Sequence, residues 1–409
     1  MKKLLNSNLT LFLDQAIISS SNFLTTVLMA RFLSLDDFGL FSLLWLALMF
    51  IFNIHLSLIV APFLNFGSKL RDNLAGFVST FFFFELILVL FIIPPIIGVL
   101  FSWGFNEKVS FSVMLIFLFF VAVYLLLDLT RRFFVLKTAY LKLVAFDFIV
   151  YIGQVIIPII IKYFGLLNIL SFFIGLLIFD LLVLLIWLLK IPLTLPEFKD
   201  LRLMFLKTWN FSKWLLGASI LQWVSNNAFS LFTAFLLGSW VIGVIRVMQN
   251  IMGVLHVFYL ALENILPRYF YKVYIVAGFE GLSRLVFRYS VYALGPFLIL
   301  FLMTKYFSED IVYFFYGSKY EPFSYLLCYF VILYFLIFVS TLFRHLYRVL
   351  EETRIIFYSY LVSVIVAVLT VYPLIKTFGI TGIVLGLISL QFAMLGVYLG
   401  RIILSLRGT

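Results

Sequence analysis

Three polar residues inside an otherwise apolar stretch have the types and spacing to bind an anion. Arg246, Gln249 and Asn250 stand at i, i+3 and i+4, so a helix places them on one face. A guanidinium can hold two oxygens of an anionic group in a bidentate fork. Charged side chains within membrane-spanning helices are costly and usually face an interior or a cavity. If Arg246 faces a cavity, it favours an anionic substrate; snorkelling of Arg246 to the membrane interface is the alternative.

Further polar side chains occur in four of the helices that the sequence predicts. Asn22 and Asn226 occupy equivalent positions in two halves of the chain, and Arg31 lies near the end of the first helix. Hydrogen bonding between neighbouring helices is the alternative function for any single amide. The polar set on these helices comprises Gln15, Asn22, Asn53, His55, Gln222, Asn226, Asn227, Gln249 and Asn250.

Two carboxylates fall deep inside apolar stretches. Glu85 and Asp180 are candidates for carrying coupling protons or sodium ions, or for pairing with a neighbouring cation. Asp128, close to Arg131 and Arg132, reads as a surface ion-pair group at a helix end. The three histidines are far apart and there is a single cysteine, so the sequence predicts no metal site, no catalytic residue and no disulfide.

The composition indicates the class of fold that positions these residues. The chain has 409 residues, of which 65% are hydrophobic and 11% charged, against about 25% charged in an ordinary soluble domain. This excludes a soluble enzyme, a nucleic-acid-binding domain and a disordered scaffold. We predict an all-α polytopic membrane protein with twelve transmembrane helices in two six-helix bundles around a central cavity. Twelve stretches are long enough to cross a bilayer: 9–33, 40–66, 75–102, 110–130, 143–164, 169–190, 212–237, 240–262, 289–306, 323–343, 355–376 and 380–404.

The basic residues predict the orientation. Most of the 29 lysines and arginines fall on one side when the connections between the twelve helices are taken in alternation. The positive-inside rule assigns that side to the cytoplasm, so both termini are predicted to be cytoplasmic. This distribution also accounts for the net charge of +11 without a nucleic-acid partner.

The chain also divides into two similar halves. Residues 1–190 and 212–409 are predicted to form one six-helix bundle each, with 191–211 as a cytoplasmic linker along the membrane surface. Lys162-Tyr-Phe-Gly165 and Lys376-Thr-Phe-Gly379 occupy the same position in each half. Each half begins inside and has an even number of helices, which predicts parallel repeats related by an axis along the membrane normal, with the substrate site between the halves.

Several stretches along the chain carry a family resemblance. They are 14–16, 21–24, 30–41, 243–250, 264–268, Tyr316-Gly-Ser-Lys-Tyr320 and 378–383. Through them the whole chain resembles the polysaccharide transporters, which are the O-antigen and repeat-unit flippases of the multidrug/oligosaccharidyl-lipid/polysaccharide exporter superfamily.

The resemblance implies a function. It implies flipping of undecaprenyl-pyrophosphate-linked oligosaccharide repeat units, for O-antigen, capsule or exopolysaccharide, across the bacterial inner membrane. Membrane lipids and other polysaccharide-assembly proteins are the further partners expected. No cofactor is expected, and a proton or sodium gradient would supply the energy. The predicted substrate-binding residues are Arg246, Arg31, Gln249, Asn250, Asn22 and Asn226.

Two alternatives remain open. An ion-coupled drug or small-molecule antiporter of the same superfamily would need acids lining its cavity, because its substrates are cationic. A polytopic glycan polymerase or ligase would be expected to carry a large outward loop with catalytic Arg or His. The predicted outward connections are all short.

Overall fold

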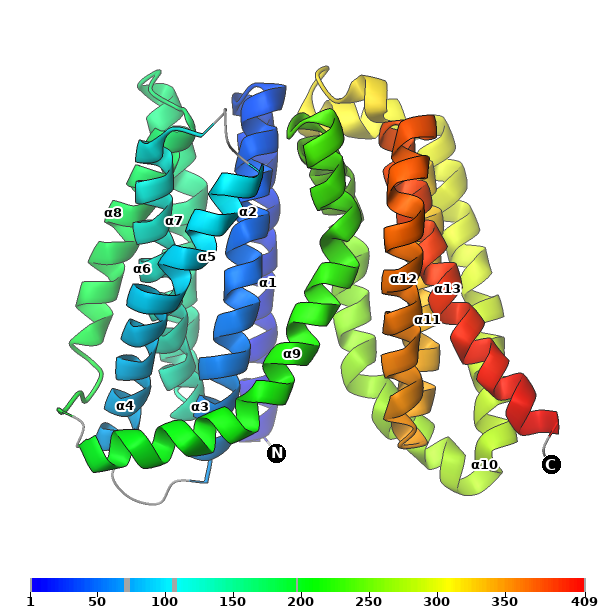
Figure 1. Ribbon diagram of the computed structural model, residues 1–409, viewed down its shortest axis with the longest axis horizontal. Coiled ribbons are helices and arrows are strands. Elements are labelled where there is room, and N and C mark those ends of the chain that lie inside the picture. The colour runs from blue at the N-terminus through cyan, green and yellow to red at the C-terminus, as the bar shows by residue number, and fades with distance from the viewer. Residues whose placement is uncertain (1, 70–73, 105–108, 196–197, 408–409) are drawn as a thin grey trace. The chain divides into compact units, whose positions relative to one another are not determined.

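The computed structural model describes residues 2–69, 74–104, 109–195 and 198–407. Within these ranges the chain is helical and contains no β-strand, which confirms the predicted all-α architecture (Figure 1). It divides into two compact units, Met1–Trp223 (unit 1) and Val224–Thr409 (unit 2). The boundary falls inside α9 (Phe198–Leu237), which runs from one unit into the other. The predicted extents 1–190, 191–211 and 212–409 stay a prediction.

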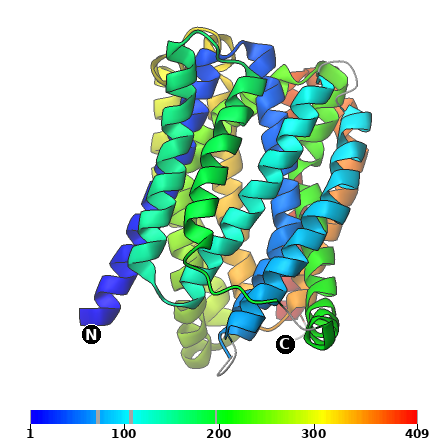
Figure 2. The ribbon, with the colours of Figure 1, turned by 90° about the vertical axis from the view of Figure 1, so that its left-hand side faces the viewer.

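Unit 1 contains six helical rods and the beginning of α9. Two of the rods are composite, because α2, η1 and α3 follow one another without a break, as do α4, η2 and α5. Figure 2 shows these helices running alongside one another. The elements are α1 (Lys2–Phe32), α2 (Leu35–His55), η1 (Leu56–Val60), α3 (Ala61–Gly67), α4 (Leu74–Ile87), η2 (Leu88–Ile92), α5 (Ile93–Gly104), α6 (Phe111–Leu136), α7 (Tyr140–Tyr163) and α8 (Ile169–Leu188).

The short elements η1 and η2 are π-helical turns, in which a backbone N–H bonds five residues back. The Ala61 N–H donates to the Leu56 carbonyl, and the Ile93 N–H donates to the Leu88 carbonyl. Prolines follow both turns, at Pro62 and at Pro94 with its neighbour, and proline has no N–H to give to the carbonyl four residues earlier. The π-turn accommodates this missing donor, because its hydrogen bonds run five residues back instead of four.

Unit 2 contains the rest of α9 and a second set of rods. They are α10 (Trp240–Tyr316), α11 (Leu326–Val349), α12 (Thr353–Phe378) and α13 (Ile380–Arg407), with the short η3 (Glu321–Phe323) between α10 and α11. Gly278 (φ 63°, ψ −166°) interrupts α10 and divides it into two arms. With α9 and these two arms counted separately, the described chain forms the twelve rods that the sequence predicts.

The break in α10 differs from the prediction. The sequence predicts helices at 240–262 and 289–306 with a long connection between them, whereas the structure stays helical on both sides of Gly278. Polar residues such as Arg284 and Glu280 mark where the chain leaves an apolar environment, but they are good helix formers. Hydropathy therefore did not predict where the helices end in this part of the chain.

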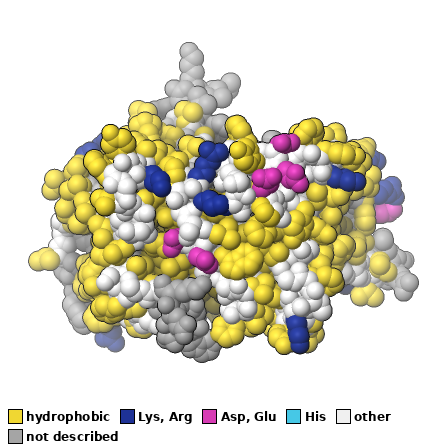
Figure 3. Space-filling view, turned by 90° about the horizontal axis from the view of Figure 1, so that it is seen from above, with side chains coloured by type: hydrophobic (Ala, Val, Ile, Leu, Met, Phe, Trp, Pro, Cys, Tyr) yellow, Lys and Arg dark blue, Asp and Glu magenta, His cyan; other side chains and the backbone are white. Residues whose placement is uncertain are grey.

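Length and hydropathy support a membrane protein. Nine of the described helices are long and apolar enough to cross a bilayer, or ten if a bent pair within α9 counts as one span. Many large apolar side chains on these helices are exposed, as lipid-facing residues would be, including Leu182, Ile186, Val368 and Leu369. Seen from above (Figure 3), hydrophobic side chains cover much of the described surface and charged side chains are scattered among them.

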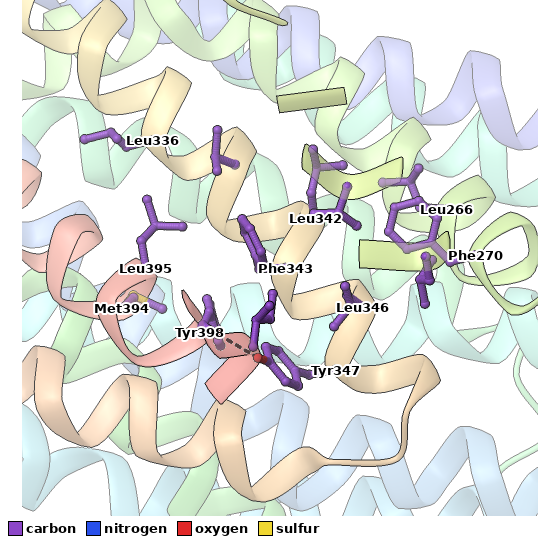
Figure 4. Packing of buried hydrophobic residues seen from close by; sticks show 14 residues of the cluster. Leu266, Phe270, Leu336, Leu342, Phe343, Leu346, Tyr347, Met394, Leu395 and Tyr398 are labelled. Carbon is purple, nitrogen blue, oxygen red and sulfur yellow. Dashed lines mark hydrogen bonds between the residues drawn. The ribbon is translucent and has the colours of Figure 1, made fainter. Parts of the chain in front are cut away.

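The core of unit 2 is packed around two tyrosines. Tyr347 of α11 donates a hydrogen bond of 2.6 Å to the Tyr398 carbonyl of α13, and the two rings stack 5.4 Å apart. Ser359 of α12 donates to the Tyr398 hydroxyl at 2.9 Å. Leucines and phenylalanines of α10, α11 and α13 surround them (Figure 4). Each buried phenol oxygen or carbonyl in this group therefore has a partner, which is what burial requires.

The two stretches matched as repeats each place a glycine just after a helix. Gly165 is the second residue after α7 and has φ 72°, and Gly379 directly follows α12 and has φ 55°. Both values lie in the left-handed region, where a side chain would cause strain. Each preceding helix contains one proline near its end, Pro158 or Pro373. The two units thus agree in the glycine conformation and the preceding proline, but five residues separate α7 from α8 whereas Gly379 alone separates α12 from α13.

Candidate functional site

The helices of unit 1 bring together buried charges that are far apart in the sequence. His55 of α2 places Nδ1 2.9 Å from Glu85 Oε2 of α4 and Nε2 3.1 Å from Asp128 Oδ2 of α6. Arg132 Nε donates to the same Asp128 oxygen at 3.0 Å. His55 and Glu85 are completely buried. An imidazolium can donate to both carboxylates at once, whereas a neutral ring can donate to only one.

A second group of buried charges centres on Arg131, the residue directly before Arg132 in α6. Arg131 donates from Nη2 to Asp14 Oδ2 of α1 and from Nε to Asp147 Oδ2 of α7, both at 2.7 Å. Within the described structure, the other oxygen of each carboxylate is buried without a hydrogen-bond partner. One guanidinium thus holds three helices together. We call the set His55, Glu85, Asp128, Arg132, Arg131, Asp14 and Asp147 the ionic cluster.

The ionic cluster corrects one prediction. Asp128, Arg131 and Arg132 were expected to form a surface group at a helix end, but their side chains are only 10%, 15% and 21% exposed. Arg131 pairs with helices α1 and α7 rather than with Asp128. The reason is packing, because this end of α6 lies inside the bundle, where its charges need partners from other helices.

Glu85 and Asp180, the two predicted coupling residues, have different surroundings. Glu85 pairs with His55. Asp180 of α8 is completely buried, and among the described residues neither of its oxygens has a hydrogen-bond partner. The same holds for both amide atoms of Gln154 on α7. An unpaired buried carboxylate is costly unless it takes up a proton or a cation. Asp180 is therefore the stronger candidate for binding a coupling proton or cation.

In unit 2 the predicted anion site lies on the first arm of α10. Arg246 is partly buried and follows five buried residues, 241–245. Asn250 donates a 2.6 Å hydrogen bond from Nδ2 to the hydroxyl of Tyr316, the last residue of the second arm. The Tyr316 phenol also lies within electrostatic reach of Arg246. Tyr316 therefore lies beside the predicted site; the sequence places it in a family motif and gives no sign that it lies near Asn250.

The other predicted substrate residues lie on α1, α9 and α10. Gln249, beside Arg246 in sequence, is exposed. Asn226 of α9 and Arg31 of α1 are exposed, while Asn22 is partly buried on α1. Their substrate role stays a prediction. Two polar residues of the wider set are engaged within their own helices, since Asn53 donates to the Met49 carbonyl at 2.7 Å and Gln15 to Ser19 Oγ at 3.4 Å.

Comparison with known proteins identifies the fold. No family model matches the chain, and no curated protein matches its sequence. Solved structures do match. A multidrug resistance MATE family transporter of the MOP superfamily, in its inward-facing conformation, has a TM-score of 0.67 at 12% identity, with 94% of each chain covered.

Two further structures extend this result. The lipid II flippase MurJ, in an inward closed conformation, has a TM-score of 0.62 at 15% identity, covering 97% of this chain and 87% of that one. A mutant of the Vibrio cholerae MATE transporter VcmN has a TM-score of 0.58 at 16% identity, covering 100% and 97%. These proteins are transporters and a flippase rather than enzymes. The chain therefore has the fold of the MOP superfamily transporters.

Proposed function

We propose that the chain is a flippase for undecaprenyl-pyrophosphate-linked oligosaccharide repeat units, working by alternating access. The observation that carries the proposal is the Arg246 group of unit 2. Arg246 is the only Lys or Arg in the apolar stretch 240–262, and Asn250 and Tyr316 form a hydrogen-bonded pair beside it. The likeness of fold to a lipid II flippase supports a lipid-linked substrate.

The chemistry of the group suits a pyrophosphate. The guanidinium offers several N–H donors in a planar fork, which matches phosphate oxygens better than the point charge of an ammonium. The Asn250–Tyr316 bond fixes the helix face next to it. We propose that Arg31, Gln249, Asn22 and Asn226 contact the remainder of the polar head group.

Energy for transport is proposed to come from a proton or sodium gradient, with Asp180 as the coupling residue. Its two oxygens are buried and lack partners in the described structure, so binding of one cation or proton would remove an uncompensated charge. Glu85 is the weaker candidate because it already has a partner in His55.

The second candidate function is an ion-coupled drug or small-molecule antiporter. The buried carboxylates of unit 1 and the likeness to a multidrug resistance transporter favour it. A cationic substrate, however, would be repelled by Arg246. The fold of transporters also favours either function over a polymerase or ligase.

We further propose a location in the bacterial inner membrane, with both termini in the cytoplasm and other polysaccharide-assembly proteins as partners. The concentration of basic residues on alternate connections supports this orientation.

The proposal is tested first in cells. Deleting the gene should abolish a surface glycan and leave lipid-linked repeat units on the cytoplasmic leaflet. A deletion strain that keeps its surface glycan but gains sensitivity to cationic drugs would support the antiporter instead.

Arg246 provides the residue-level test. Arg246→Ala should abolish glycan export and Arg246→Lys should retain part of it, at unchanged membrane expression. Loss of a buried charged contact costs about 2–5 kcal/mol, or at least about 30-fold. Arg284→Ala is the matched control, because Arg284 lies on the same helix, exposed and paired with Glu280. Full export by the Arg246→Ala variant would contradict the proposed site.

A further inference from the structure

We propose that residues 201–214, at the beginning of α9, form a binding surface for the headgroups of anionic phospholipids. We call this stretch the α9 surface segment. The inference does not depend on which substrate is transported, because it concerns the bilayer around the protein.

One face of the segment, which is itself part of unit 1, contacts α3 and α4. Phe205 packs against Phe84 of α4 with ring centres 6.2 Å apart, and Phe211 packs against Phe66 of α3 at 5.5 Å. Thr208, midway between them, is buried. Figure 1 shows the beginning of α9 crossing the end of unit 1 near α3 and α4. The contact with Phe66, one residue before the end of α3, holds the segment at the level where α3 ends.

The remaining surface of the segment combines apolar and basic side chains. Trp214 is 79% exposed and Leu203 60%, and Leu206 and Trp209 are also exposed. The exposed basic residues between them are Arg202, Lys207 and Lys213. The sequence contains no Asp or Glu from 201 to 223. Tryptophan favours the membrane–water interface, and a basic amphipathic helix is attracted to anionic lipid.

The lysines keep donors for a phosphate. Lys207 Nζ lies 4.6 Å from the centre of the Phe66 ring, and Lys213 Nζ donates to Asn210 Oδ1 at 3.3 Å. An ammonium has three N–H donors, so these contacts leave N–H groups for headgroup oxygens. A phosphate with hydrocarbon chains satisfies the lysines and the tryptophans together. A soluble acidic protein would satisfy only the basic residues, and for that reason we assign the surface to lipid.

The test uses the single cysteine of the chain. In the full-length protein, Cys328→Ser with Leu206→Cys gives one site on the segment for a polarity-sensitive fluorophore. The labelled protein is placed in nanodiscs of phosphatidylcholine, with or without phosphatidylglycerol as a minority component. We expect emission at shorter wavelength when phosphatidylglycerol is present, and reversal of this shift at high salt.

A charge-matched pair of variants completes the test. The triple variant Arg202→Gln, Lys207→Gln and Lys213→Gln should lose the response to phosphatidylglycerol. Removing three basic residues weakens binding to an anionic surface by up to about a hundredfold. The control triple variant Lys162→Gln, Lys319→Gln and Lys376→Gln removes the same charge from exposed positions elsewhere and should keep the response.

Three results would overturn the inference. The first is equal emission in both kinds of nanodisc, which would show that the segment does not distinguish anionic lipid. The second is an unchanged response in the segment variant, and the third is an equal loss in the control. Thermal denaturation of each variant in detergent, by intrinsic fluorescence, ensures that only folded protein is compared.

Discussion

Replacing Arg131 should destabilise unit 1 more than replacing any exposed arginine. Its guanidinium bonds Asp14 of α1 and Asp147 of α7 at 2.7 Å each. Arg131→Met keeps much of the apolar stem but leaves both carboxylates buried without their cation. The carboxylates cannot turn to water, because their side chains are only 4% and 1% exposed.

The size of the effect follows from this burial. Breaking a buried ion pair by removing one partner costs about 3–5 kcal/mol, a large part of the about 5–15 kcal/mol that stabilises a typical domain. The exposed pair Arg284–Glu280, with side chains 74% and 67% exposed, provides the contrast. An exposed pair contributes about 0–1 kcal/mol, so Arg284→Met should change stability little.

The assay is thermal or denaturant unfolding of the purified variants in detergent, followed by intrinsic fluorescence. Arg131→Met should unfold well below the wild type and Arg284→Met close to it. A third variant, Arg131→Met with Asp14→Asn and Asp147→Asn, removes the stranded charges and should recover most of the loss. If Arg131→Met matched Arg284→Met in stability, or if the two asparagines gave no recovery, the assignment of Arg131 as a buried three-helix tie would be refuted.

Three other predictions concern coupling, packing and topology. Asp180→Asn removes a buried carboxylate without a hydrogen-bond partner, so it should raise thermal stability. The same variant should make transport in proteoliposomes insensitive to an imposed proton or sodium gradient. Unchanged dependence on the gradient would show that Asp180 does not couple transport to it. Gly153→Ala should destabilise by about 1–3 kcal/mol, because a Cβ there would lie 2.1 Å from the Phe179 ring, whereas Gly396→Ala, with open space around it, serves as the control in the same unfolding measurement. Reporter fusions after Thr194 and at the carboxyl terminus should both report a cytoplasmic location, and an outside signal from either would reverse the predicted orientation.

The rods could be predicted from the sequence, because a bilayer crossing requires about 20 apolar residues and this requirement is visible in composition alone. The turns at Gly165 and Gly379 were also predictable, since glycine between two apolar stretches commonly ends a helix. The helical arms around Gly278 were not, because charged residues there continue the helix beyond the apolar stretch.

The candidate site was only partly predictable. Arg246 and Asn250 share a face by their spacing, but their neighbour Tyr316 is 66 residues from Asn250 and reaches it only after α10 folds back at Gly278. Glu85 and His55 each stand out in the sequence as polar residues in apolar stretches, but the sequence does not show that they are partners. A charged residue in an apolar stretch of the sequence indicates that a partner is needed. Which residue is that partner depends on how the helices pack.

The two π-helical turns have a consequence for any comparison of this chain by helical periodicity. A π-turn accommodates one more residue than an α-turn, which shifts the phase of every following side chain by about 100° relative to an uninterrupted α-helix. In η2 the extra residue is visible as three consecutive exposed side chains, Leu90, Phe91 and Ile92. A helical wheel drawn across 74–104 would therefore assign the wrong side chains to lipid in α5, and the same holds for α3 in 35–67. A cysteine-accessibility scan through either rod should show two periodic patterns that are out of phase, with the change within 88–92 or 56–60.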